Sequence, residues 1–125
     1  MRQALEAAGV PVPGFRGVKT VSEARRAAAE LGMPVIVKPA DANASKGVQR
    51  VDYEEDVSLA FHQALKYSRS QTVLVEEYMT GDEYNVDGLV YRGAYRLGGI
   101  TGKELSAPPF RFDVGIFMPP TVDGR

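Results

Sequence analysis

Segments with helical spacing of apolar residues alternate along this chain with segments of strand-like spacing, and no segment is repeated. Apolar residues recur every three or four positions in three segments, which predicts helices at residues 1–8, 20–31 and 53–67. Short apolar runs predict strands at residues 34–38, 47–52, 72–76, 85–91 and 94–101. Helices placed among hairpin-connected strands favour an α+β fold.

Local signals define where these elements begin and end. Ser22 is the expected N-cap of the second helix and Gly32 its stop. The acidic residues 54–56 suit the first turn of the third helix, because the helix dipole is positive there. Residues 10–15 include two prolines and are expected to be extended. The Arg92-Gly93 pair predicts a tight turn between the last two strands.

The end of the chain has no helical period and is rich in proline. Four prolines lie in the final eighteen residues. Residues 107–125 are therefore expected to form a loop, or part of a longer domain.

Composition narrows the class of protein. The 125 residues carry 15 basic and 16 acidic side chains, without the basic excess of a nucleic-acid-binding domain. There is no cysteine, which excludes disulfides and cysteine-based zinc sites. The single histidine, His62, is expected at the surface. No apolar run approaches the ~20 residues of a membrane span, and no signal peptide is visible, so we expect a cytoplasmic protein.

The segment from Val35 to Val48 carries the first chemical signal. An apolar strand, of the kind covered on both faces, leads to Lys38 and then to a loop of small residues. Small residues let the backbone approach an anion, and Ser45 and Lys46 add a hydroxyl and an ammonium group. This pattern is typical of a nucleotide phosphate site, although an ordinary turn beside a solvated lysine has the same residues. The segment is not a P-loop, because Lys46 precedes its glycine.

A second cluster follows the strand at residues 72–76. Glu76 and Glu77 end this strand, and their side chains point to opposite faces because strand side chains alternate. The chain then turns at Gly81 and places Glu83 at the start of the next strand. Backbone groups near such a turn can read the edge of a planar base. A solvated acidic strand end remains the alternative for this cluster taken alone.

In this order and spacing, the two clusters resemble the ATP-grasp superfamily of carboxylate-activating ligases. The likeness is to the branch with carbamoyl phosphate synthetase large subunits, biotin carboxylases and amino-acid ligases. Residues 7–15 resemble the segment that leads into the central lobe of that superfamily, and residues 99–110 the strand and loop that follow it. The resemblance implies a central nucleotide-binding subdomain at residues 1–79 and the start of a C-terminal subdomain, truncated, at residues 80–125.

The resemblance also implies roles at the phosphate end of the nucleotide. Lys38 matches the lysine that contacts the phosphate and the adenine side. Ser45, Lys46 and Gly47 match the loop that closes over the terminal phosphates. Lys103 is a further candidate for a phosphate contact.

At the base and ribose end, four more positions match. Glu76 corresponds to the carboxylate near the adenine amino group. Glu77 and Met79 correspond to hinge positions whose backbone groups read the base. Glu83 corresponds to the acid that binds the ribose hydroxyls.

Two departures from the superfamily pattern stand out. Ala42 and Ala44 occupy positions where glycine is common, which predicts a stiffer loop. No Glu-x-Asn pair follows Lys103, so the magnesium ligands are expected outside this chain and no metal-binding residue is assigned. No catalytic acid or base is assigned either.

The resemblance implies that this chain is the ATP-binding part of a ligase. Such a ligase uses MgATP to activate a carboxylate as an acyl phosphate, which an amine or thiol then attacks. Its expected partners are ATP, the small substrates and the remainder of a parent polypeptide, and the 125 residues alone are expected to be inactive. The alternative is a non-catalytic nucleotide-binding module with a regulatory or partner-binding role. A protein kinase is excluded, because H-R-D and D-F-G motifs are missing.

Overall fold

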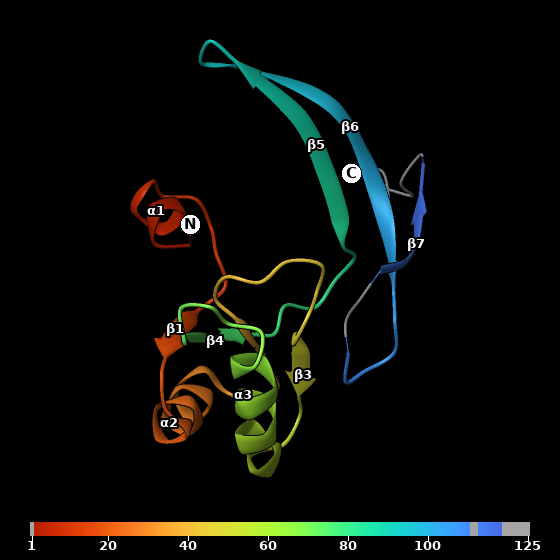
Figure 1. Ribbon diagram of the computed structural model, residues 1–125. Helices are drawn as coiled ribbons and strands as arrows, with labels where there is room; N and C mark the ends of the chain where they lie inside the picture. Colours follow the sequence, from red (N-terminus) through yellow and green to blue (C-terminus); the bar gives the residue numbers. More distant parts are fainter. Residues whose placement is uncertain (1, 111–112, 119–125) are drawn as a thin grey trace. The chain divides into compact units, whose positions relative to one another are not determined.

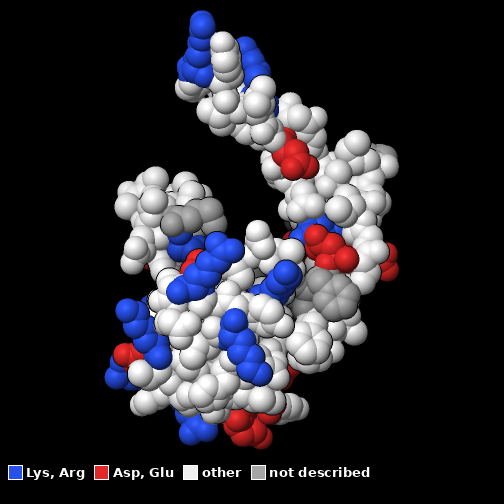
Figure 2. Space-filling view, viewed as in Figure 1, with Lys and Arg blue, Asp and Glu red and all other residues white. Residues whose placement is uncertain are grey.

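The computed structural model describes residues 2–110 and 113–118, and the chain divides into two compact units. The first unit comprises residues 1–79 and 108–111, and the second comprises residues 80–107 and 112–125. Among the described residues, no helix is both long and apolar enough to cross a membrane. Basic side chains are spread over the visible surface of the first unit, several of them beside acidic ones (Figure 2).

Three α-helices belong to the described part of the first unit (Figure 1). They are α1 (Arg2–Ala7), α2 (Val21–Leu31) and α3 (Val57–Leu65), and a 3₁₀ turn, η1 (Glu54–Asp56), precedes α3. The three predicted helices are confirmed. The third is shorter than predicted, and its first turn is a 3₁₀ helix.

The N-cap of α2 is Thr20, so the prediction of Ser22 was wrong. Thr20 has extended backbone angles, and its hydroxyl accepts a hydrogen bond from Glu23 N–H at 3.2 Å. The Glu23 carboxylate in turn accepts from Thr20 N–H at 3.1 Å and from Lys19 N–H at 2.8 Å. This reciprocal capping box places the N-cap two residues before Ser22, because it satisfies amides that the first turn leaves unpaired.

The first unit contains a four-stranded antiparallel sheet in the order β1-β4-β2-β3. Its strands are β1 (Phe15–Val18), β2 (Val35–Pro39), β3 (Gln49–Val51) and β4 (Val73–Glu77). The hairpin predicted from residues 34–52 is confirmed by the pairing of β2 with β3. The strand β1 was not predicted, because only Val18 of its four residues is buried and no apolar run marks it.

One face of this sheet packs on α2 and α3 (Figure 1), and side chains on the opposite face are partly exposed. Burial alternates along β2, where Val35 and Val37 are buried while Ile36 and Lys38 are partly exposed. The expectation of a strand covered on both faces was therefore wrong. The core between sheet and helices consists of small and branched side chains around one aromatic ring: Val18, Ala24, Ala27, Ala28, Val35, Val37, Val51, Val57, Ala60, Phe61, Ala64, Val73 and Val75.

The second unit contains a three-stranded antiparallel sheet in the order β5-β6-β7. Its strands are β5 (Tyr84–Tyr91), β6 (Ala94–Leu105) and β7 (Asp113–Phe117). The tight turn is confirmed, since Arg92 and Gly93 both have positive φ, at 49° and 77°.

The strand β7 corrects the expectation that residues 107–125 form a loop. It pairs with β6 along residues 102–105, and no proline lies within its five residues. Residues 108–110 instead join the first unit, where Pro109 C=O accepts a hydrogen bond from Arg50 N–H at 2.9 Å and Phe110 bridges to Gln49. Residues 111–112 and 119–125 lie outside the described residues.

Candidate functional site

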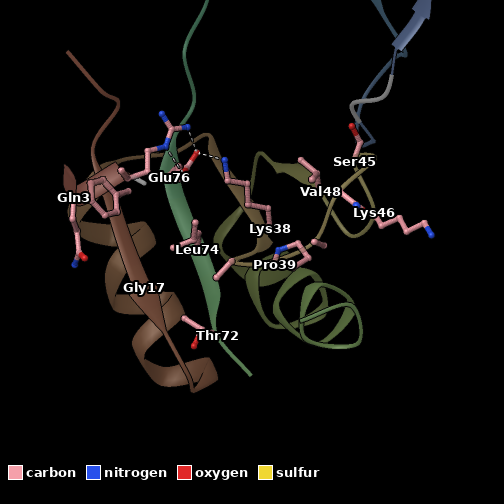
Figure 3. Close-up of a pocket in the computed structure, with 15 residues that line it drawn as sticks. Gln3, Gly17, Lys38, Pro39, Ser45, Lys46, Val48, Thr72, Leu74 and Glu76 are labelled. Atoms are coloured by element: carbon pink, nitrogen blue, oxygen red, sulfur yellow. Dashed lines mark hydrogen bonds and ion pairs between the residues drawn. The ribbon is translucent and has the colours of Figure 1, made fainter. Parts of the chain in front are cut away.

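The open face of the first sheet carries a pocket of about 480 Å³, which is within the range of small-molecule sites. Strand alternation explains its lining, because the side chains that point away from the helices belong to every second residue. Lys38 of β2, Leu74 and Glu76 of β4, and Phe15 and Gly17 of β1 all lie on this face (Figure 3). The sequence pattern of alternating exposure therefore places one basic and one acidic side chain in the same pocket.

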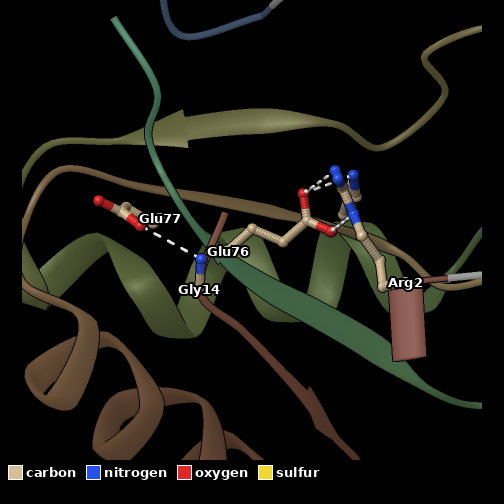
Figure 4. A network of polar contacts seen from close by, with 5 residues as sticks. Arg2, Gly14, Glu76 and Glu77 are labelled. Carbon is tan, nitrogen blue, oxygen red and sulfur yellow. Dashed lines mark hydrogen bonds and ion pairs between the residues drawn. The ribbon is translucent and has the colours of Figure 1, made fainter. Parts of the chain in front are cut away.

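Glu76 is the centre of the polar contacts in this pocket. Its side chain is almost fully buried, yet it holds two cations (Figure 4). Lys38 Nζ lies 2.6 Å from Oε2, while Arg2 donates from Nε to Oε1 at 3.0 Å and from Nη2 to Oε2 at 3.0 Å. Burying a carboxylate is costly unless it is paired, so these contacts explain how the site tolerates Glu76.

The local charge of this group favours an anionic ligand. One carboxylate faces two cations, so the triad of Arg2, Lys38 and Glu76 carries a net positive charge. Both cations are about three-quarters buried, with 27% and 25% of their side chains exposed. Because partly buried charges are screened less by salt than exposed ones, this excess is effective at short range.

A loop after β2 forms another wall of the pocket, and we call residues 42–46 the pocket loop. Ala42, Asn43, Ser45 and Lys46 line the cavity. Ala44 and Ser45 have φ values of 54° and 55°, a left-handed conformation that glycine adopts without strain. The Lys46 side chain extends away from Lys38 in Figure 3. The pocket loop thus presents small side chains and backbone to the cavity.

The remaining candidates from the first unit do not line the pocket. Gly47 follows the pocket loop and packs on α3. Glu77 points to the face opposite Glu76, as alternation required, and accepts a hydrogen bond from Gly14 N–H at 3.2 Å (Figure 4). Met79 is 61% exposed.

Glu83 and Lys103 lie together in the second unit. Lys103 Nζ is 2.6 Å from Glu83 Oε1 and 2.9 Å from Asp113 Oδ1. Burial lowers the pKa of the Lys103 ammonium, but the hydrogen bonds to Glu83 and Asp113 outweigh it and raise the pKa above its usual value. Lys103 is therefore a charged, well-held cation between two carboxylates.

Two residues of these clusters were missed from the sequence. Arg2 belongs to a short helix without a motif, and Asp113 lies in a segment that was expected to be a loop. Neither residue carries a local sequence signal, because Arg2 contacts a side chain 74 residues away and Asp113 reaches Lys103 through the pairing of β7 with β6.

The described residues do not fit a magnesium site. They contain no group of three histidine or acidic side chains that could hold a metal ion. Glu76, the carboxylate in the pocket lining, is already paired with two cations. The placement of magnesium ligands outside this chain stays a prediction.

Comparisons with known proteins identify the family. Residues 4–97 match the family model described as D-ala D-ala ligase C-terminus. The carbamoyl phosphate synthase large chain of Mycobacterium tuberculosis is 32% identical over 97% of this chain and 11% of its own length. A D-alanine–D-alanine ligase of Ectopseudomonas mendocina is 36% identical over 68% of this chain and 26% of its own.

A solved structure, the VanG D-Ala:D-Ser ligase of Enterococcus faecalis, superposes with a TM-score of 0.79 at 26% identity. It covers 97% of this chain, which covers 37% of that protein. The chain thus spans about a quarter or less of the curated relatives quoted above. These matches confirm the resemblance found in the sequence: the chain belongs to the D-Ala-D-Ala ligase C-terminus family, within the ATP-grasp superfamily.

Proposed function

We propose that the first unit binds ATP, as part of an ATP-dependent ligase that joins a carboxylate to an amine or a related nucleophile. The observation that carries this proposal is the pocket in which Lys38, Glu76 and the pocket loop meet. Family membership supports the same reaction class. Residues 1–79 would then be the central nucleotide-binding subdomain, and residues 80–125 the beginning of the C-terminal subdomain.

Within this proposal, the phosphates bind at the basic end of the pocket. Lys38 is held by Glu76 and keeps donor positions for a phosphate oxygen, because an ammonium group has three N–H donors. Ser45, Lys46 and the backbone of the pocket loop supply further donors. Lys103 is a candidate for an additional phosphate contact.

Glu76 is proposed to bind the adenine amino group. A carboxylate offers about four acceptor positions. The contacts from Arg2 and Lys38 use one position on Oε1 and two on Oε2. One position on Oε1 therefore remains for an amino N–H. Glu77 and Met79 follow as candidate backbone contacts to the base, and Glu83 as the candidate for the ribose hydroxyls.

The proposed reaction has two steps. A carboxylate oxygen of the substrate attacks the terminal phosphorus of ATP, so that ADP leaves and an acyl phosphate forms. The amine then attacks the acyl carbon and displaces inorganic phosphate. The contribution of this chain is to orient the triphosphate and to place fixed positive charge beside the phosphoryl group as it transfers.

Replacing Lys38 tests the proposal. In the full-length protein, Lys38→Ala should weaken ATP binding by about 1–3 kcal/mol, the range for a hydrogen bond to a charged group. Lys66→Ala is the matched control, since Lys66 follows α3 and does not line the pocket. Isothermal titration calorimetry with a non-hydrolysable ATP analogue measures both affinities.

The outcomes separate the candidate functions. Equal affinities for the two variants would contradict the assignment of the pocket. ATP binding with phosphate release that depends on a carboxylate and an amine supports the ligase. ATP binding without any turnover in the full-length protein would favour the non-catalytic module.

A further inference from the structure

The start of the pocket loop is tied to the turn that follows α3. Asp41 stands between β2 and the pocket loop, and its Oδ2 accepts a hydrogen bond from Ser70 N–H at 2.8 Å. Its Oδ1 accepts from Arg69 N–H at 3.1 Å and lies 3.0 Å from Ser68 Oγ. One carboxylate thus holds three consecutive residues of the turn.

The turn itself is fixed to the sheet. Ser68 is buried, and its hydroxyl accepts a hydrogen bond from Thr72 N–H at 3.0 Å. Thr72 C=O accepts from Ala40 N–H at 3.0 Å, so the residue before Asp41 is bonded to the same turn. Desolvation raises the pKa of the Asp41 carboxyl, but hydrogen bonds from Ser68 and Ser70 outweigh it and lower the pKa, which keeps this group charged near neutral pH.

The end of the pocket loop is held separately by Gly47. A Cβ added to Gly47 would lie 2.8 Å from Tyr67 Cδ2, 3.2 Å from Pro39 Cγ and 3.3 Å from Ala64 Cα. The contact with the Tyr67 ring is under 3.0 Å, so this ring would have to move. The contact with Ala64 is also tight, and it is to backbone. Gly47 also has a φ of 72°, which favours glycine. The backbone at Gly47 therefore fits closely against the end of α3.

We propose, on the basis of the proposed binding of ATP, that Asp41 and Gly47 are positioning residues. They hold the pocket loop in the position in which it binds the terminal phosphates. They fasten both ends of the pocket loop to the end of α3 and the turn after it. Between these two anchors, residues 42–46 are all exposed and depend on them for their position. An unanchored loop would have to be ordered each time ATP binds, and that loss of entropy would reduce affinity.

The expected loss of affinity is confined to nucleotides whose phosphates reach the pocket loop. In the full-length protein, Asp41→Asn should weaken ATP binding about fivefold or more, while AMP affinity changes less than about twofold. The amide keeps the shape of the side chain, but its NH₂ group faces an N–H donor of the turn and cannot accept from it. Asp52→Asn is the matched control, because Asp52 pairs with Arg50 and lies outside the pocket lining. Calorimetric titration with AMP and a non-hydrolysable ATP analogue measures the affinities.

A second variant tests the other anchor. Gly47→Ala should produce the same ATP-selective loss, whereas Gly32→Ala should not. Gly32 has a similar φ of 82°, but a Cβ there would meet nothing within 4 Å, so this pair separates the close approach from backbone strain.

Several results would overturn the inference. Equal losses for AMP and ATP, together with a lower free energy of unfolding, would mean that Asp41 only stabilises the unit. No loss in either anchor variant would also reject it. If the wild-type protein bound no ATP, the proposed function would fail and this inference with it, whereas ATP binding without a selective loss would reject the inference alone.

Discussion

At the scale of single residues, Glu76 connects the stability of the first unit with its candidate chemistry. The residue is 3% exposed, and its carboxylate lies between Arg2 and Lys38. The negative charge of Glu76 stabilises the two cations, because each of their side chains is only about a quarter exposed to water. At the same time, the contact sets the position of the Lys38 ammonium, which is the group proposed to bind phosphate.

Neutralising Glu76 should therefore destabilise the first unit. Glu76→Gln is expected to lower its free energy of unfolding by about 1–3 kcal/mol, since two charge-assisted contacts become weaker. Glu77→Gln is the matched control, because the Glu77 side chain lies on the other face and accepts an exposed hydrogen bond from Gly14 N–H. Urea denaturation of both variants measures the difference. A larger effect at Glu77 would show that the triad contributes little to stability.

At the scale of secondary structure, the start of α2 depends on one reciprocal cap. Thr20 and Glu23 exchange hydrogen bonds, and Glu23 also accepts from Lys19 N–H. The backbone N–H groups of Lys19 and Thr20 lower the pKa of the Glu23 carboxyl, so its charged form belongs to the cap. The helix in turn contributes Ala24, Ala27 and Ala28, which lie on one of its faces, to the core.

The position of this cap can be tested with two neighbouring hydroxyl residues. Thr20→Ala should reduce the free energy of unfolding by about 0.5–2 kcal/mol, the usual cost of losing an N-cap. Ser22→Ala should change it by less than about 0.5 kcal/mol, because Ser22 lies within the first turn. Chemical denaturation of both variants gives the comparison. The reverse order would restore Ser22 as the cap.

The sequence predicted those elements that carry their own local signal. The hairpin of β2 and β3, the helix α3 and the Arg92-Gly93 turn could be found because apolar spacing and turn chemistry are encoded locally. The strand β1 could not, since it pairs with β4, far along the chain, and β7 could not, although its partner β6 is the preceding strand. The short edge strand β1 buries one residue, and β7 shows no apolar run long enough to mark it.

The candidate site, like the fold, was predicted only in part from the sequence. Lys38 and Glu76 could be placed on one face by strand alternation, and the structure brings them within 2.6 Å. Arg2 and Asp41 could not be assigned, because their partners lie 74 and 27 residues away along the chain. Contacts of that separation depend on the assembled fold rather than on local spacing.

At the scale of the whole molecule, the two units differ in how much they bury. Among its described residues, the first unit has a core of thirteen buried apolar residues. In the described part of the second unit only Gly102 is buried, and large apolar side chains such as Leu89, Val90 and Ile116 are 60–67% exposed. Local stability follows the density of buried contacts, so the two units should open independently and at different free energies.

Native-state hydrogen exchange on the 125-residue chain would measure this difference. Amides of β4 and β2, the two strands of the first sheet with neighbours on both sides, should exchange slowest. Amides of β5, β6 and β7 should exchange faster, because little buried surface opposes their opening. The comparison is made within one sample, so intrinsic exchange rates can be corrected residue by residue. Equal protection in the two sheets would contradict the expectation.

The order of strands in the first sheet also has a consequence for synthesis on the ribosome. β4 comes last in the chain but lies between β1 and β2. While residues 15–51 emerge, β2 and β3 can form their hairpin, but β1 has no partner until β4 arrives, since Phe15 pairs with Glu76. Such distant pairings form late. The nascent chain would therefore leave β1, and the edge of β2 that β4 later covers, unpaired until translation has passed Glu77 and released β4 from the exit tunnel.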